Sequence, residues 1–238
     1  MSDVKPVPQV TSVTSTGIWR VGRKADPYAV RQQPALRLDD TTSGNRFDSI
    51  SGRFETVYYA TTQRGAFYEV LQGFAPDPRL VALVAEEWAT AGHMEPGSMP
   101  AIWREERLLV RAALPGRYLD VEDTQTRAFL SSELRSFLAV MGLRSITVPV
   151  VRGDNRLVTR FVAEWAWSQI DRTGAPLYAG VRYASKLDSG SECWAAFRRV
   201  DPLTGLEVHP PREIERLAIL KNERHLKEIA DLLGLVVH

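Results

Sequence analysis

Hydrophobic and polar positions repeat with two different periods along this chain, which indicates that both strands and helices are present. Residues 54–60 are rich in Phe, Thr, Val and Tyr and predict a short strand. Thr61 and Thr62 then offer side chains that can cap a helix. The apolar positions that follow recur at helical spacing: Ala66, Phe67, Val70, Leu71 and Phe74. Residues 44–74 therefore predict a loop, a strand and an amphipathic helix in direct succession.

The rest of the pattern predicts further elements on both sides of this unit. Strands are expected at residues 17–22, within 103–114, and at 117–121, 177–185 and 192–198, with an extended segment at 148–152. Helices are expected at residues 79–91, 124–140, 156–170 and, continuous or interrupted, 212–233. Strands and helices interleave without a regular βαβ order, and no internal repeat is visible. The pattern predicts an α+β fold in a single domain, with a split mixed or antiparallel sheet and flanking helices.

Three segments are expected along the chain. Residues 1–16 are rich in Pro, Val, Ser and Thr without stable periodicity, and we expect them to form a loose N-terminal arm. Residues 17–198 hold the main domain. Residues 199–238 pass through a turn-rich stretch and are expected to form a C-terminal helical extension packed on the same domain.

Composition and charge narrow the classes of function. Thirty Lys and Arg residues nearly balance 29 Asp and Glu residues, giving a net charge of +1. No global field therefore favours nucleic acid or an anionic membrane, and an anionic ligand must be bound by local groups. The N-terminus lacks a signal-peptide pattern, and no apolar run approaches the length of a membrane span, so we expect a cytoplasmic protein. The single cysteine, Cys193, lies in an apolar run and is expected to act as a small buried hydrophobe.

Several familiar kinds of catalytic site have no counterpart in the sequence. The four histidines fall in turns, in a late helix and at the terminus, without an HExxH motif or partner cysteines, so no metal site is expected: His93, His209, His225 and His238. The chain also has no Walker loop, no GxGxxG after a strand and no GxSxG nucleophile elbow.

What remains is a set of arginine, tyrosine and glutamate side chains in residues 44–69. Arg46 lies in the predicted loop, and its guanidinium suits phosphate. Tyr58 lies in the predicted strand and has a ring that can stack on nicotinamide or adenine. Glu69 lies roughly 130° from the centre of the helix's apolar face, so it points to solvent or into a cleft. There it can bind ribose hydroxyls or stabilise an oxocarbenium-like cation. Each residue type is common, and composition alone favours the ordinary interpretation, with Arg46 a solvated loop residue, Tyr58 a sheet residue and Glu69 an exposed helix position.

Five sequence elements in a fixed order give these residues a more specific interpretation. They are Trp19-Arg20, Asn45-Arg46-Phe47-Asp48, Val57-Tyr58-Tyr59-Ala60, Ala66-Phe-Tyr-Glu69 and Gly180-Val-Arg-Tyr-Ala-Ser185. In this order and spacing, the chain resembles the RES domain family, which is named for its Arg, Glu and Ser. Trp19 stands where the family usually has Tyr, and Tyr59 stands where it usually has Leu.

The resemblance implies a fold similar to ADP-ribosyltransferase toxins and a place as the toxin of a type II toxin–antitoxin pair. Such toxins degrade NAD+ by phosphorolysis or hydrolysis of the nicotinamide–ribose bond, and some modify a protein with ADP-ribose. NAD+ is then the substrate, inorganic phosphate a possible co-substrate, and an antitoxin protein the partner; no resident cofactor is implied. Carried over by position, Arg46, Glu69 and Ser185 are the catalytic set. Arg20 and Tyr58 complete the substrate pocket.

Two assignments and the function itself have alternatives. Arg53 follows Gly52 and rivals Arg46, although Arg46 carries the fuller motif. Tyr59 rivals Tyr58, and strand alternation allows only one of them to face the pocket. The expected roles are phosphate binding for the two arginines Arg20 and Arg46, and hydrogen bonding to a phosphate or ribose oxygen for Ser185, which has no neighbouring base to make it a nucleophile. A protein ADP-ribosyltransferase and a non-catalytic nucleotide-binding module are the alternative functions.

Overall fold

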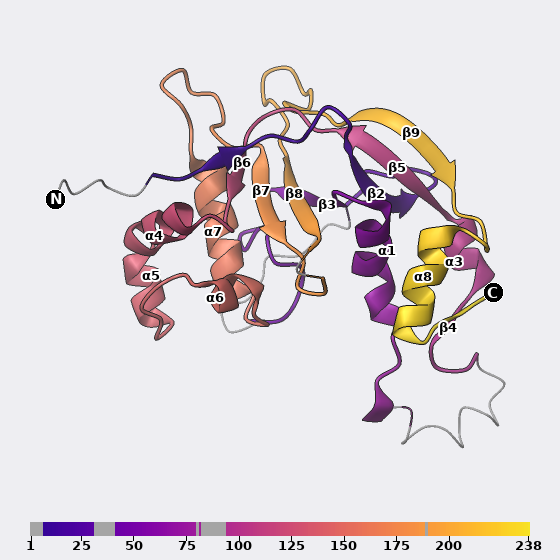
Figure 1. Ribbon diagram of the computed structural model, residues 1–238. Coiled ribbons are helices and arrows are strands. Elements are labelled where there is room, and N and C mark those ends of the chain that lie inside the picture. Colours follow the sequence, from indigo (N-terminus) through magenta and orange to yellow (C-terminus); the bar gives the residue numbers. More distant parts are fainter. Residues whose placement is uncertain (1–6, 31–40, 80, 82–93, 189) are drawn as a thin grey trace.

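The computed structural model describes residues 7–30, 41–79, 81, 94–188 and 190–238. The helix expected at residues 79–91 lies almost entirely outside the described residues. Figure 1 shows the described elements as a curled sheet with helices packed beneath both of its ends. This arrangement confirms the predicted single α+β domain.

Eight strands form the main sheet in the order β1-β6-β7-β8-β3-β2-β5-β9. Their bounds are β1 Val10–Thr11, β2 Ile18–Arg23, β3 Glu55–Ala60, β5 Arg107–Ala113, β6 Tyr118–Asp120, β7 Gly180–Ala184, β8 Glu192–Arg198 and β9 Arg212–Ala218. All neighbouring pairs are antiparallel except β6 and β7, which are parallel. A separate two-stranded parallel sheet joins β4 (Ser98–Met99) to β10 (Val236–Val237).

The helices form two groups, one at each end of the sheet. The bounds are α1 Gln63–Leu71, followed by the 3₁₀ turn η1 Gln72–Phe74, then α3 Ala101–Glu105, α4 Thr124–Glu133, α5 Arg135–Val140, α6 Val148–Arg152, α7 Leu157–Ser168 and α8 Arg224–Leu233. Helices α4 to α7 lie near β6 and β7, whereas α1, α3 and α8 lie near β2 and β5 (Figure 1). Among the residues that the structure describes, no helix is long and apolar enough to cross a membrane.

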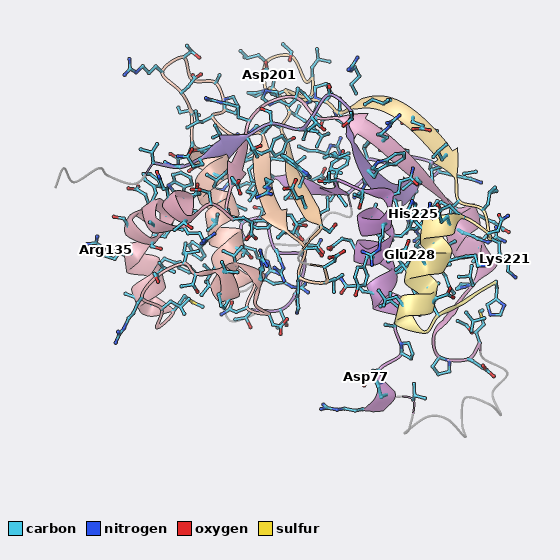
Figure 2. All side chains as sticks on the ribbon, viewed as in Figure 1. Asp77, Arg135, Asp201, Lys221, His225 and Glu228 are labelled. Carbon is cyan, nitrogen blue, oxygen red and sulfur yellow. The ribbon has the colours of Figure 1, made fainter. Side chains whose placement is uncertain are left out.

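Helix α1 is fixed on two sides. Its buried residues include Phe67 and Leu71, each less than 1% exposed, which pack into the main core. Burying a side chain of this size stabilises the fold by about 1.5–3 kcal/mol. On its outer side, Arg64 donates from Nε to Glu228 of α8 at 2.7 Å, and Figure 2 shows Glu228 on α8 beside α1. The sheet and α8 together determine where α1 holds its polar side chains.

Adjacent residues of β3 separate two cores on opposite faces of the sheet. Tyr58 packs against the larger cluster, which contains Phe47 and Phe67. Tyr59 is buried in the smaller cluster with Tyr118 and Trp194. This is the alternation that a strand imposes on successive side chains.

Three predicted elements were wrong or incomplete, each for a physical reason. Residues 212–218 form β9 and not a helix, because they pair with the edge of β5, and Arg111 of β5 forms an ion pair with Glu215 at 2.8 Å. Residues 148–152 form α6, where Pro149 occupies the first turn, a position that tolerates proline. The helix expected at 124–140 divides into α4 and α5 at Leu134, whose backbone leaves helical geometry.

The expected N-terminal arm is partly held on the sheet. Val10 and Thr11 form β1 and pair with Leu119 and Tyr118 of β6. The backbone N–H of Gln9 also donates to Oγ1 of Thr126 at 2.8 Å. Backbone pairing of this kind needs no apolar periodicity, so the sequence pattern gave no sign of it.

Candidate functional site

A cavity of about 340 Å³ opens between the loop at residues 44–48, strands β2 and β3, helix α1 and the segment at residues 183–187. Four of the five predicted site residues line it: Arg20, Arg46, Tyr58 and Glu69. The fifth, Ser185, is 3% exposed and lies behind Glu69. The structure thus brings together five residues that span 165 positions in sequence, from Arg20 to Ser185.

Glu69 presents a carboxylate that is held from one side. Thr62 begins α1 by accepting a hydrogen bond from the N–H of Gly65 at 3.0 Å, and Glu69 follows on the cavity side of the helix. Oγ of Ser185 donates to Oε1 of Glu69 at 2.6 Å, and Sγ of Cys193 approaches the same oxygen at 3.7 Å. Oε2 has no hydrogen-bond partner among the described residues. One carboxylate oxygen is therefore fixed, and the other is available to a ligand.

Ser185 does not contact the cavity, which differs from its expected bond to a phosphate or ribose oxygen. Its Oγ accepts a hydrogen bond from the N–H of Leu187 at 3.1 Å while it donates to Glu69. A hydroxyl with its single hydrogen already donated can orient a neighbouring carboxylate. In this geometry Ser185 holds Oε1 of Glu69 and does not line the cavity.

Arg46 is fixed by the end of a short helix. Its Nη1 donates to the carbonyl oxygen of Val151 at 2.9 Å, and its Nη2 donates to that of Arg152 at 2.7 Å. These are the last two residues of α6, where carbonyl groups lack partners within the helix. Burial lowers the pKa of Arg46, and the nearby Tyr183 and Glu69 oppose that shift. Three of the five guanidinium N–H groups remain for a ligand.

Arg20 is largely engaged with the backbone. Its guanidinium donates to the carbonyl oxygens of Pro27 at 2.8 Å, Tyr58 at 3.0 Å and Ala29 at 3.3 Å. Burial lowers the pKa of Arg20, with Tyr59 opposing the shift. Arg20 therefore links residues 27–29 to β3 and forms part of the cavity wall. Two of its five guanidinium N–H groups remain for a ligand.

Tyr58 anchors the loop that carries Arg46. Its hydroxyl donates to Oδ1 of Asp48 at 2.7 Å and accepts from the N–H of Phe47 at 3.0 Å. Asp48 in turn accepts from the N–H of Asn45 at 2.6 Å, which closes a turn around Arg46. Burial first, and then the charge of Asp48, raises the pKa of Tyr58 well above its ordinary value. The NRFD element is therefore a loop closed by its own aspartate and held by Tyr58.

Replacing Tyr58 by phenylalanine is expected to destabilise the protein by about 1–3 kcal/mol, because Asp48 and the Phe47 N–H each lose a buried partner. Urea unfolding of the variant measures this loss. Tyr68→Phe on α1 is the matched control. The Tyr68 ring lies below the Arg64 guanidinium, with 6.0 Å from Cζ of Arg64 to the ring centroid, and its hydroxyl does not anchor a loop. Equal stability of Tyr58→Phe and the wild type would contradict the anchoring role.

The structure also separates the two rival arginines. Arg53 is exposed, donates from Nε to Oγ of Ser51 at 3.0 Å, and does not line the cavity. Arg46 does line it. Tyr59 borders the cavity as well, but its side chain belongs to the core on the other face of the sheet.

Three further cavity residues were missed by sequence reasoning. The ring of Tyr183 packs against that of Phe47, with 4.8 Å between the ring centroids. Tyr183 lies within the GVRYAS element, but no site role was predicted for it. Arg156 donates to the carbonyl oxygen of Gly44, and Lys186 forms an ion pair with Asp154. Neither of these two cations lies in a pattern that marks a site. The tertiary fold places both of them in the same cavity as Arg46.

The cavity wall is rich in positive charge. Arg20, Arg46, Arg156 and Lys186 face two acidic residues, Asp48 and Glu69. Asp48 is already occupied by Tyr58 and Asn45. Within the described ranges, no group of three His, Cys, Asp or Glu residues is arranged to hold a metal ion. The arrangement can bind an anionic ligand and place one carboxylate against it.

Comparison with known proteins gives one match. A family model described as the RES domain matches residues 18–219, which is most of the chain. No curated protein and no solved structure matches. RES domains are associated with toxin–antitoxin systems. The match spans strands β2 to β9 of the main sheet and every residue of the cavity named above, so the chain belongs to the RES domain family.

Proposed function

We propose that this protein is the toxin of a type II toxin–antitoxin pair and degrades NAD+ by cleaving the bond between nicotinamide and ribose. The observation that carries the proposal is the Glu69 carboxylate, held by Ser185 on the wall of a cavity that it shares with Arg46. Cleavage of this bond generates positive charge at C1 of the ribose, and a fixed carboxylate stabilises that charge. An arginine in the same cavity suits the pyrophosphate of the dinucleotide.

The reaction needs no resident cofactor. The bond from C1 to the nicotinamide nitrogen breaks, and nicotinamide leaves with the electron pair as a neutral base. Oε2 of Glu69 faces the developing cation or the ribose hydroxyls, while Oε1 stays bonded to Ser185. Water then adds to C1 and releases a proton to solvent, giving ADP-ribose, or a phosphate anion adds and gives ADP-ribose 1-phosphate. The ring of Tyr58 or Tyr183 provides the apolar surface beside nicotinamide.

Arg156 and Lys186 are proposed to add to the anion-binding wall beside Arg46. Replacing either residue by glutamine is expected to raise the KM for NAD+, or for phosphate in a phosphorolytic reaction, by about 5- to 50-fold with a smaller effect on kcat. Steady-state kinetics with each substrate varied in turn measures both constants. Lys221→Gln, in the turn before α8 (Figure 2), is the control because it lies away from the cavity. Unchanged KM values in both variants would remove these residues from the site.

Two alternatives have different products. A protein ADP-ribosyltransferase uses the same cavity but transfers ADP-ribose to an acceptor, and a non-catalytic module binds a nucleotide without cleaving it. NAD+ labelled in the adenylate half distinguishes the three functions. Label in free ADP-ribose or its phosphate supports the proposal, label bound to protein supports transfer, and label that stays in NAD+ supports the binding module.

The proposal includes a cytoplasmic location, where NAD+ is available, and a cognate antitoxin protein that blocks the cavity. Cellular NAD+ is expected to fall when the chain is expressed alone and to recover when the adjacent reading frame is expressed with it. NAD+ that stays constant in both cultures would contradict the toxin role.

A further inference from the structure

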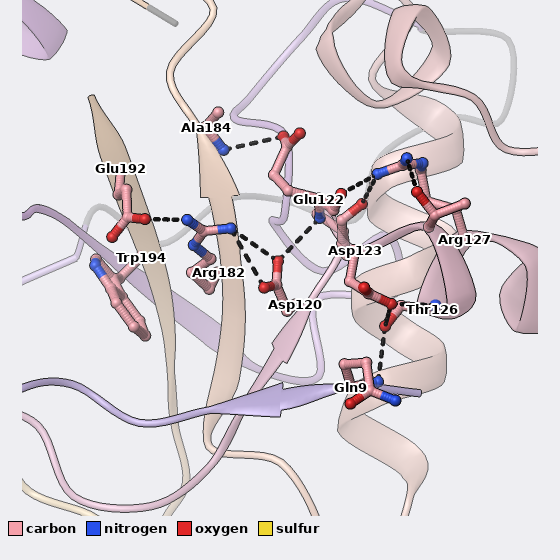
Figure 3. Close-up of polar contacts among 12 residues, drawn as sticks. Gln9, Asp120, Glu122, Asp123, Thr126, Arg127, Arg182, Ala184, Glu192 and Trp194 are labelled. Carbon is pink, nitrogen blue, oxygen red and sulfur yellow. Dashed lines mark hydrogen bonds and ion pairs between the residues drawn. The ribbon is translucent and has the colours of Figure 1, made fainter. Parts of the chain in front are cut away.

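A largely buried carboxylate outside the five motif elements connects the two halves of the cavity wall. Glu122 follows β6, and its side chain is 12% exposed. Its Oε1 accepts a hydrogen bond from the backbone N–H of Ala184 at 3.0 Å, the contact shown in Figure 3. Its Oε2 accepts from Nη2 of Arg152 at 2.8 Å. One side chain thus contacts both the end of β7 and the end of α6.

Each of these contacts leads directly to a site residue. Ala184 precedes Ser185, whose Oγ donates a hydrogen bond to Oε1 of Glu69 at 2.6 Å. The backbone carbonyl oxygen of Arg152 accepts a hydrogen bond from Nη2 of Arg46 at 2.7 Å. Glu122 is therefore connected to Arg46 through Arg152, and to Glu69 through Ala184 and Ser185, without lining the cavity itself.

The electrostatics of Glu122 favour a permanently charged, fixed group. Burial alone raises the pKa of Glu122, but the hydrogen bonds from Arg152 and Ala184 outweigh it and bring the pKa below its ordinary value. A neighbouring cluster of charged residues has no such connection to the cavity. Asp120 and Glu192 both bind Arg182 (Figure 3), but that cluster does not contact Arg46.

We propose that Glu122 is a positioning residue that sets the placement of Arg46 relative to Glu69 by holding α6 against the end of β7. This inference rests on the proposed function for its kinetic test. A displacement of a binding group by about 1 Å lowers the rate on the order of 100-fold, so small shifts of α6 have large effects.

A double-mutant cycle with Arg46 tests the proposal. Glu122→Gln is expected to lower kcat/KM for NAD+ by about 10- to 100-fold in the wild-type background. In an Arg46→Lys background it is expected to lower kcat/KM by less than about 3-fold, because lysine no longer makes the paired bonds to Val151 and Arg152. Glu192→Gln, which loosens the ion pair with Arg182, is the matched control and is expected to have the same small effect in both backgrounds. Equal losses for Glu122→Gln in the two backgrounds would overturn the proposal.

A second readout does not depend on NAD+ cleavage. In protein labelled with ¹⁵N at arginine, the Arg46 guanidinium signal, assigned by its loss in Arg46→Lys, is expected to broaden or shift in Glu122→Gln and to remain in place in Glu192→Gln. If Glu122→Gln fails to fold, Arg152→Gln replaces it, because that change removes the guanidinium and keeps the carbonyl that Arg46 uses. An unmoved Arg46 signal in a folded variant would also overturn the proposal, whether or not the protein cleaves NAD+.

Discussion

Glutamine at position 69 is expected to reduce nicotinamide release from NAD+ by at least about 100-fold, with little effect on the fold. The amide has the shape of the carboxylate and can still accept the hydrogen bond from Ser185, so the helix and its contacts remain in place. The variant loses only the negative charge that stabilises the cation at C1. A fall in kcat/KM without a fall in the midpoint of thermal unfolding is the expected signature.

The matched control for this experiment is Glu228→Gln on α8. Glu228, labelled on α8 in Figure 2, carries the same side chain and forms an ion pair with Arg64 of α1, but it does not line the cavity. Its replacement is expected to leave nicotinamide release within about 2-fold of the wild type, because exposed ion pairs contribute about 0–1 kcal/mol. If Glu69→Gln kept nearly full activity, the proposed role of the carboxylate would be wrong.

The second large effect is expected from Arg46 in comparison with Arg53. Arg46→Ala removes the guanidinium from the cavity and leaves the carbonyl groups of Val151 and Arg152 without their donors. The expected result is a fall in kcat/KM on the order of 100-fold and a loss of about 1–3 kcal/mol of stability. Arg53→Ala, on an exposed side chain seven positions later, is expected to change either quantity by little.

Kinetics and urea unfolding of the two alanine variants measure these effects in parallel. The pair is informative because sequence patterns alone left the two arginines as rivals. Comparable losses of activity in both variants would show that the loop around Gly52 also contributes to the site. A larger loss in Arg53→Ala would contradict the assignment of Arg46.

The loop, strand and helix over residues 44–74 could be predicted from the sequence because their signals are local. The β-favouring run predicted β3, the helical spacing predicted α1, and the helical wheel placed Glu69 roughly 130° from the centre of the apolar face. The structure confirms each of these elements. It also confirms the opposite orientations of Tyr58 and Tyr59 that strand alternation requires.

The contacts within the site could not be predicted, because they depend on tertiary packing. Glu69 meets Ser185 across 116 positions, and Arg46 meets the end of α6 across more than 100. Only the resemblance to the RES domain grouped these residues in advance. It did not reveal that Ser185 orients Glu69, that Arg20 binds backbone carbonyls, or that Glu122 contacts both halves.

The wrong element at residues 212–218 has a similar origin. This segment mixes charged and apolar residues without a clear period. Its strand conformation depends on backbone hydrogen bonds to the edge of β5. An edge strand exposed on both faces carries little periodic signal. Its assignment as part of the sheet required the partner strand.

Quantifying nicotinamide released by the purified wild-type chain tests the central claim most directly. Incubation with NAD+, with and without inorganic phosphate, is expected to release nicotinamide catalytically, in amounts well above that of the protein. Faster release with phosphate indicates phosphorolysis, and equal rates indicate hydrolysis. The Glu69→Gln variant is expected to release almost none. If the folded wild-type protein released no nicotinamide under either condition, the proposal that this cavity cleaves NAD+ would be contradicted.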